Sequence, residues 1–371
     1  MLQIARDEPA AYLRAASVLN HSRADAVCLQ HEYGIWGGPD GGFVLDFARA
    51  LRKPIVTTLH TVPQAPSDSQ RRILKALVGL SAATVVMSHR AAALLAERYG
   101  VAERDLDVIE HGVPDLPLVD PNSVKTLVGL DVRPTILSFG LIGPGKGYES
   151  VIEAMPEVVR TEPRALYVIL GATHPELLRR EGEAYRTRLS RLAESLGVAD
   201  RVRFVDRYVD LGELTRWLQA ADVFVTPYPN PDQIVSGTLS YAMGAGKAIV
   251  STPYAYATEM LGDGVGVVVP PASPKALAEA LGDLLRHGGR RQELGRRAYE
   301  RSRSMIWPEV GRKYRAVFAR VVAGAREDIS GALPRAGSPA VLSPAVLAPE
   351  VGEAVPGRVS RAGSGVRAGD D

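Results

Sequence analysis

Cysteine and long apolar runs are scarce in this chain. Cys28 is the single cysteine, which excludes an internal disulfide and any metal site built from several cysteines. It lies in the apolar run 26–29, and we expect it to be buried as a small hydrophobic residue. No apolar run approaches the roughly 18 residues of a membrane span. The N-terminus lacks the apolar core of a signal peptide.

An excess of charge of either sign is also missing. The 44 basic residues nearly balance the 42 acidic ones, which leaves a net charge of +2. Nothing in this balance indicates a nucleic-acid partner. A hydrophobic content of 46% with 23% charged residues is typical of soluble globular proteins. We therefore expect a cytoplasmic protein, and its oligomeric state stays open.

Short β-branched runs alternate with helical segments along most of the 371 residues. Most runs are continuously apolar, as in parallel strands that are buried on both faces. This alternation predicts an α/β fold with doubly wound parallel sheets, and the length allows two such domains. The expected strands are 24–30, 54–60, 83–88, 107–109, 135–140, 165–171, 202–206, 222–227, 248–252 and 266–269.

A segment rich in Pro and Asp, within 113–134, separates two series of strands. The first series has three clear strands and a short fourth one, whereas the second has six. We therefore expect the first domain to be incomplete, with an N-terminal portion missing and a sheet edge exposed. Residues 330–371 hold 5 Pro, 7 Gly and no aromatic residue. This composition predicts a disordered tail.

A glycine-rich segment follows the expected strand 135–140. Residues 139–147 read FGLIGPGKG, with four glycines among eight residues. Such a loop lets backbone N–H groups approach a ligand, and Lys146 adds a cation suited to phosphate. The segment is not a Walker A loop, because no Ser or Thr follows the lysine. By pattern alone it could equally be a tight turn with a solvated lysine.

A second segment, 227–240, follows the expected strand 222–227 and leads into a helix. Ser236, Gly237 and Thr238 are typical of a helix start, where free N–H groups and hydroxyls can hold an anion. An ordinary capped helix would explain this segment as well. Ligands of open α/β sheets bind beyond the carboxyl ends of the strands. We therefore predict that the two segments form the two sides of a diphosphate site.

Polar residues also follow two strands of the first half. His31 and Glu32 come after 24–30, and His60 ends 54–60. They could face one cleft, where His60 would accept a proton or polarise a substrate hydroxyl. A histidine at a strand end is more often a structural hydrogen-bonding residue. No metal site is expected, because these residues lack metal-ligand spacing with another cluster.

Taken in order, these segments resemble retaining glycosyltransferases of the GT-B fold, in the large group called family 4. Residues 139–147 resemble the family's FxGRLxxxKG donor-phosphate loop. Residues 232–251 are similar to its EGFGLPxLEAMAxGxPVVAS segment, and 108–113 to the VIPNGVD that ends the first domain. The order of several motifs makes this resemblance, which covers about residues 24–320, more specific than one glycine loop.

The resemblance implies two Rossmann-like domains that face a cleft. It assigns 1–115 to an acceptor domain, 116–133 to a linker, 134–305 to a sugar-nucleotide-binding domain, and 306–325 to a helix that crosses back to the first domain. It implies a sugar-polarising role for His60, a donor-sugar contact for Asp232, and acceptor-side positions for His31, Glu32 and Gly38. The implied donor-binding residues are Gly140, Lys146, Gly147, Gln233, Ser236, Gly237, Thr238, Leu239, Ser240 and Glu259.

The chain departs from the family pattern at three positions. Leu141 stands where the family has an arginine, so one phosphate cation is missing unless Arg207 or another side chain replaces it. In the family's paired-glutamate motif, the first position is Asp232 and the second is Ser240. The first glutamate usually contacts the donor sugar, and the second meets the ribose, for which Glu259 could partly substitute. We interpret these changes as those of a divergent subgroup.

The resemblance implies transfer from a nucleoside-diphosphate sugar to a hydroxyl of a carbohydrate or lipid-linked acceptor, with retention and with no metal or other cofactor. A non-catalytic remnant that binds nucleotide sugars is one alternative, because the N-terminal part is short and because Leu141 and Ser240 depart from the family. Another GT-B enzyme, such as a sugar-nucleotide epimerase, is the second. A phosphorylase is disfavoured, because no lysine is placed to anchor pyridoxal phosphate.

The segment Arg286–Arg320 carries 11 basic residues against 3 acidic ones. A basic helical face of this kind could dock on anionic lipid, as a peripheral membrane contact. A solvated arginine-rich face is the more common explanation of such a run.

Overall fold

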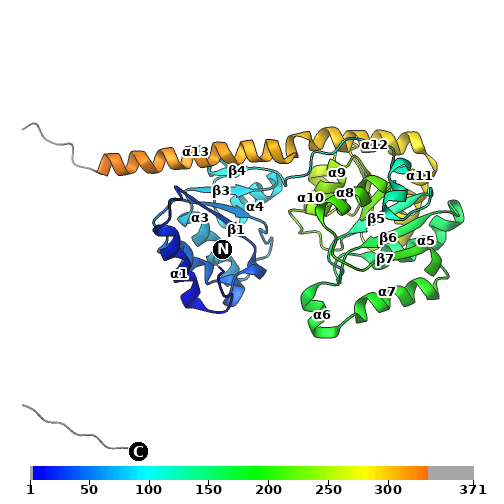
Figure 1. The fold of residues 1–371 in the computed structure, drawn as a ribbon, viewed down its shortest axis with the longest axis horizontal. Helices are drawn as coiled ribbons and strands as arrows, with labels where there is room; N and C mark the ends of the chain where they lie inside the picture. The colour runs from blue at the N-terminus through cyan, green and yellow to red at the C-terminus, as the bar shows by residue number, and fades with distance from the viewer. Residues whose placement is uncertain (1–2, 333–371) are drawn as a thin grey trace, which may run out of the picture. The chain divides into compact units, whose positions relative to one another are not determined.

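A computed structural model describes the backbone of residues 3–332 and the side chains of residues 3–327. Two parallel sheets, each flanked by helices, form the framework of this part of the chain (Figure 1). The predicted α/β class is therefore confirmed. The residues up to Glu327 form one compact unit.

The first sheet has the strand order β1-β2-β3-β4, and all neighbours are parallel. β2 and β3 are buried along their whole length, whereas β1 alternates between buried and exposed residues. Cys28 lies on β1 and is exposed, so the prediction that it is buried was wrong. β1 is an edge strand of the sheet, and Cys28 is one of its two exposed positions, which alternate with buried ones. The strands are β1 (Val27–His31), β2 (Ile55–Leu59), β3 (Ala83–Val86) and β4 (Leu106–Val108).

Helices cover both faces of the first sheet. On one face Tyr12, Phe47 and Leu77 pack against the strands from three successive helices. On the other face Val317 and Val321 of the last helix pack on the sheet (Figure 1). These helices are α1 (Pro9–Asn20), α2 (Val44–Ala50), α3 (Asp68–Leu80), α4 (His89–Tyr99) and α13 (Trp307–Ala332).

The second sheet has the order β10-β9-β8-β5-β6-β7, and it is also parallel. The chain adds strands on one side of β5 and then, from β8 onward, on the other. The carboxyl ends of β5 and β8 therefore form the topological switch point, where doubly wound sheets bind ligands. The strands are β5 (Thr135–Phe139), β6 (Leu166–Leu170), β7 (Val202–Val205), β8 (Val223–Thr226), β9 (Ala248–Ser251) and β10 (Val267–Val268).

The helices of the second sheet include two short ones that the sequence pattern did not predict, α6 and α10. The set is α5 (Tyr148–Thr161), α6 (Pro175–Glu181), α7 (Ala184–Ser195), α8 (Leu211–Ala220), α9 (Gly237–Gly244), α10 (Ala255–Leu261), α11 (Pro274–Arg286) and α12 (Gly288–Arg301). Single 3-10 turns lie at Tyr33–Ile35, Pro39–Gly41, Glu103–Asp105, Pro121–Ser123, Lys125–Val128, Ala199–Arg201 and Ser302–Met305.

The chain returns to the first sheet after α12. The N–H of Val113 donates to the carbonyl of Met305 at 2.9 Å, and the N–H of Trp307 donates to the carbonyl of Val113 at 2.9 Å. Helix α13 then follows, and Tyr314 shares a hydrogen bond of 2.9 Å with Thr58 on β2. The helix continues to Ala332, beyond residue 325 and into the predicted tail; residues 333–371 lie outside the described part.

Most cations of Arg286–Arg320 have a carboxylate partner within the protein. Arg296, for example, contacts Glu293 and Glu300. Eight of the 11 basic residues have such a partner: Arg290, Arg291, Arg296, Arg297, Arg303, Arg312, Lys313 and Arg320. This pairing favours the solvated face over a lipid-binding one. No helix within residues 3–332 is long and apolar enough to cross a membrane.

Candidate functional site

The glycine-rich loop after β5 lies directly against the end of β8. Gly140 has a φ of +134° and Gly147 a φ of +71°, and both angles are in the region that favours glycine. A Cβ built on Gly147 would lie 2.0 Å from the carbonyl oxygen of Pro227. The close approach of the two backbones therefore requires glycine at this position. It brings the loop beside the segment that follows β8.

Lys146 contacts an aromatic ring of that segment. Its Nζ lies 4.6 Å from the ring centre of Tyr228, a cation–π contact. The hydroxyl of Tyr228 is 2.7 Å from Oγ1 of Thr238, which is 3.1 Å from Oγ of Ser236. Ser236 caps α9 by accepting the N–H of Leu239. The first N–H groups of α9 lack intrahelical partners and can bind an anion. The two segments therefore lie side by side, and the diphosphate site between them stays a prediction.

A cavity of about 220 Å³ opens beside Lys146. Arg180 on α6 lines it and is paired with Glu181, whereas Arg207 is paired with Glu213 and does not line it. If a second cation replaces the family arginine at Leu141, its position therefore belongs to Arg180 rather than to Arg207. The walls are Leu141, Gly143, Pro144, Lys146, His174, Glu176, Leu177 and Arg180.

Three of the predicted donor-binding residues do not line the cavity beside Lys146. Leu239 is fully buried in the core under the second sheet. The Oγ of Ser240 donates to the carbonyl of Ser236 at 3.0 Å and lies 2.8 Å from the hydroxyl of Tyr256. Both oxygens of Glu259 accept backbone N–H groups at the start of α4, from His89 and Arg90 at 2.9 Å each. Glu259 therefore links α10 to α4 and does not line the cavity beside Lys146.

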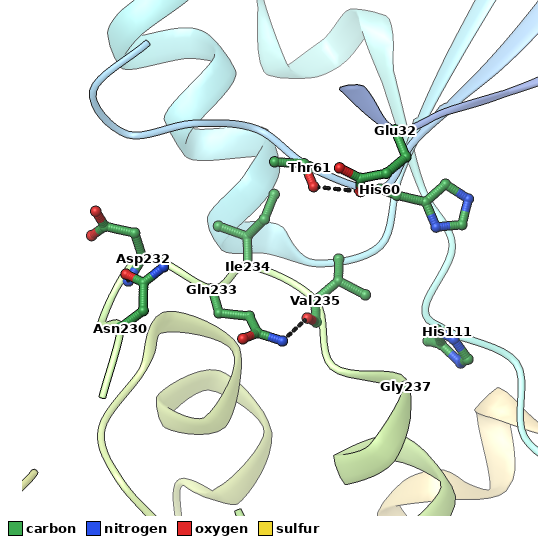
Figure 2. Close-up of a pocket in the computed structure, with 10 residues that line it drawn as sticks. All are labelled: Glu32, His60, Thr61, His111, Asn230, Asp232, Gln233, Ile234, Val235 and Gly237. Atoms are coloured by element: carbon green, nitrogen blue, oxygen red, sulfur yellow. Dashed lines mark hydrogen bonds between the residues drawn. The ribbon is translucent and has the colours of Figure 1, made fainter. Parts of the chain in front are cut away.

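A second cavity, of about 410 Å³, lies between the two sheets' loops. Glu32, His60 and Thr61 line it from the carboxyl ends of β1 and β2, and His111 lines it from the segment after β4. The loop that follows β8 forms the opposite wall (Figure 2). That wall consists of Asn230, Asp232, Gln233, Ile234, Val235 and Gly237. We call this cavity the cleft.

The environment of the cleft favours the neutral form of His60. Its Nε2 is 2.7 Å from Oε1 of Gln30. Burial lowers the pKa of His60 below its usual value, and the negative charge of Glu32 offsets part of this shift. Glu32 itself accepts a hydrogen bond of 2.6 Å from Thr61. His60 can therefore polarise a hydroxyl without carrying a charge at neutral pH.

Asp232 is separated from the two histidines of the cleft. In Figure 2 the rings of His60 and His111 lie on one side of the view, whereas Asn230 and Asp232 lie on the other. Asp232 is exposed, and its N–H donates to the side-chain oxygen of Asn230 at 3.0 Å. The structure thus brings His60 and Asp232 to one cleft but not into contact.

His31 and Gly38 do not line the cleft. Both ring nitrogens of His31 are buried without a hydrogen-bond partner among the described residues, and Tyr33 packs edge-on at 4.8 Å. Burial, with a smaller contribution from His60, lowers the pKa of His31 to about 4. Gly38 has a φ of +78°, and its position is crowded by the ring of Phe43. Both residues belong to the interior of the first domain.

Replacing His31 with phenylalanine is expected to make the protein less sensitive to acid. The pKa of about 4 lies below the usual 6.5. The neutral ring therefore contributes stability that is complete above pH 6.5 and is lost as the pH falls toward 4. Because of this linkage, the unfolding free energy of the wild type should be about 2 kcal/mol lower at pH 5 than at pH 7.5. Urea unfolding at both pH values measures it.

The exposed His21 provides the matched control for this change. His21→Phe should keep the acid sensitivity of the wild type, whereas His31→Phe should lose most of the difference between the two pH values. An equal pH dependence in His31→Phe and wild type would contradict the assignment.

Six polar side chains of the two cavities were not predicted as site residues: Thr61, His111, Asn230, His174, Glu176 and Arg180. His111 follows β4, so the rule that ligands bind beyond strand ends could have identified it. Asn230 lies in the segment after β8 that the pattern singled out. Arg180 gave no such signal, because α6 is short and its start was not predicted.

Residues 128–301 match the family Glycosyl transferases group 1, and residues 3–115 match Glycosyltransferase Family 4. A D-inositol 3-phosphate glycosyltransferase from Xylanimonas cellulosilytica is 31% identical over 291 residues, which cover 72% of this chain and 66% of that protein. The chain spans between 53% and 66% of the length of three curated relatives of that name.

Solved structures show the same architecture. The sucrose-phosphate synthase from Thermosynechococcus elongatus has a TM-score of 0.69 at 20% identity, with 84% of this chain and 78% of that one covered. Anabaena Alr3699/HepE in complex with UDP has a TM-score of 0.64 at 16% identity, with 87% and 82% covered. These likenesses confirm the predicted GT-B fold, with a first domain that is short.

Proposed function

Since this chain belongs to the group 1 and family 4 glycosyltransferases, we propose that it transfers a sugar from a nucleoside-diphosphate sugar to an acceptor hydroxyl, with retention of configuration. The observation that carries the proposal is the cleft of about 410 Å³. In it, histidine and carboxylate side chains of the first sheet face the loop that leads into α9. Lys146 and the start of α9 adjoin that loop. This arrangement supports an anion site next to a polar site for hydroxyl groups.

The donor diphosphate binds at the end of the second sheet in this proposal. Lys146 contributes a positive charge from one side, and the N–H groups of Gly237 and Thr238 point from the other. The hydroxyls of Ser236 and Thr238 are already linked to Tyr228, so these groups are held in place before a ligand arrives. Lys146, these N–H groups and the hydroxyls would stabilise the negative charge that develops on the leaving phosphate.

The sugars occupy the cleft itself. His60 polarises a hydroxyl of the donor sugar or of the acceptor, and Asp232 with Gln233 contacts the donor sugar from the opposite wall. The bond from the anomeric carbon to the phosphate oxygen breaks as the bond to the acceptor oxygen forms on the same face. The proton of the acceptor hydroxyl passes to the leaving diphosphate.

The acceptor is proposed as a carbohydrate or a lipid-linked sugar or polyol. The polar walls of the cleft suit a molecule with several hydroxyl groups, and the relative from Xylanimonas is named for D-inositol 3-phosphate. The Anabaena protein has been solved with UDP and with UDP-glucose, which supports a nucleotide sugar as the donor. The proposal requires no further cofactor.

A panel of UDP-glucose, GDP-mannose and ADP-glucose tests the donor site. At a concentration about 100 times its Kd, a ligand of the folded state stabilises it by about 2.7 kcal/mol. We therefore expect one of the three to raise the melting temperature by several degrees, and to be consumed when acceptors are added. A panel without any shift in melting temperature would contradict the proposal.

The two alternatives give different results in the same panel. A non-catalytic protein would bind a nucleotide sugar but release no nucleoside diphosphate with any acceptor. An epimerase would change the sugar of the donor in the absence of an acceptor, which NMR of the recovered nucleotide sugar detects.

A further inference from the structure

His111 lines the cleft, and the proposed reaction assigns it no role. It stands where the family pattern VIPNGVD has an asparagine. Its ring packs edge-on against Tyr241 of α9 at 6.0 Å. A Cβ built on Gly237 would lie 2.9 Å from Nε2 of His111. The Nε2 atom is therefore located at the start of α9, where the proposed diphosphate site begins.

The hydrogen bond at the other ring nitrogen determines which tautomer is present. Nδ1 of His111 is 2.9 Å from the carbonyl oxygen of Gly112. Because a carbonyl oxygen can only accept, Nδ1 carries the hydrogen. In the neutral ring Nε2 is then a bare acceptor that faces the cleft. Burial and, to a smaller extent, His60 lower the pKa of His111, and the hydrogen bond to Gly112 offsets part of this shift, so the neutral ring predominates at pH 7.

A bare Nε2 does not suit a neighbouring phosphate. Phosphate oxygens carry only lone pairs, so the two groups would face each other without a hydrogen bond and with unfavourable electrostatics. A proton on Nε2 turns the ring into a donor and a cation, which forms a charge-assisted hydrogen bond. On the basis of the proposed function, we propose that His111 takes up a proton when the donor diphosphate binds and donates it from Nε2 to a phosphate oxygen.

The groups around His111 allow this change of charge. His60 faces it from the end of β2, Glu32 lines the same cleft from the end of β1, and Tyr241 contacts it from α9. Glu110, next in the chain, is paired with Lys313 of α13. An added positive charge on His111 is favoured by Glu32 and by the diphosphate itself, and His60 opposes it only when its own ring is protonated.

Protonated His111 would also act on the reaction. Its charge lies beside the phosphate that leaves, so it stabilises the charge that develops as the glycosidic bond of the donor breaks. The asparagine of the family pattern can donate a hydrogen bond but carries no charge. This chain therefore couples donor binding to pH in a way that the family pattern does not predict.

Calorimetric titration of UDP-glucose, GDP-mannose and ADP-glucose in two buffers of different ionisation enthalpy measures the proton uptake. A nucleotide sugar has no phosphate group that titrates between pH 6 and pH 8, so uptake in this range reports on the protein. With the nucleotide sugar that binds, we expect the wild type to take up a fraction of a proton approaching one. We also expect its affinity to fall by up to tenfold per pH unit as the pH rises.

His111→Asn restores the family residue, and His21→Asn, at an exposed histidine outside the cleft, is the matched control. We expect His111→Asn to bind without proton uptake and with an affinity that is independent of pH, whereas His21→Asn keeps the uptake. Binding without proton uptake by the wild type, or uptake unchanged in His111→Asn, would overturn the inference and leave the proposed function standing. Absence of binding by all three nucleotide sugars would overturn both.

Discussion

Replacing Lys146 with alanine is expected to lower kcat/KM for the donor by roughly 10² to 10³-fold, the usual effect of removing one group that stabilises a developing negative charge. The loss should be large here because Leu141 stands where the family has a second cation. Lys146 is half-buried and its ammonium group lies over Tyr228, so it is already placed beside the start of α9. Steady-state kinetics with varied donor measure the effect.

Lys275→Ala is the matched control, since that lysine is exposed near the start of α11 and lines neither cavity. We expect wild-type kinetics for this control. Both variants should melt within about one degree of the wild type, because an exposed or half-exposed lysine contributes little to stability. Equal activity of Lys146→Ala and Lys275→Ala would remove Lys146 from the donor site.

The framework of the fold could be predicted from the sequence because its strands are short, apolar and separated by helices. A continuous apolar run of this kind is typical of a strand that is buried on both faces of a parallel sheet. Each expected strand therefore lies within a few residues of an observed one, as with 135–140 and β5 (Thr135–Phe139). The positions of the loops followed from the strands, since a loop after a parallel strand lies at the carboxyl edge of the sheet.

The contacts of single side chains could not be predicted in the same way. Ser240 was chosen by its position in a motif, and Glu259 was chosen as a partial substitute for the glutamate that Ser240 replaces. Ser240 instead bonds to Ser236 and Tyr256, and Glu259 caps α4. The capping contact joins residues 170 positions apart in the chain, and no local pattern contains it. The exposure of Cys28 is a similar case, because it depends on what covers an edge strand rather than on the apolar run around it.

Replacing Gly147 with alanine is expected to destabilise the protein by about 3 kcal/mol or more and to abolish measurable donor binding. Part of the cost is the left-handed backbone, at about 1–2 kcal/mol for a residue with a Cβ. The larger part is the clash of that Cβ with the carbonyl oxygen of Pro227, 2.0 Å away, since overpacking typically costs a further 1–3 kcal/mol or so. A backbone oxygen cannot rotate away as a side chain can, so the loop must move off the end of β8.

Gly145→Ala in the same loop separates the two causes. Gly145 also has a positive φ, +89°, but a Cβ built on it would have no atom within 4 Å. Gly145→Ala should therefore lose only the stability that the left-handed backbone costs, and it should retain donor binding. Urea unfolding and calorimetric titration of both variants measure the difference, which we expect to be about 2 kcal/mol. Similar losses in the two variants would mean that the loop does not depend on its contact with Pro227. The diphosphate site would then need Lys146 but not the close approach of β5 and β8.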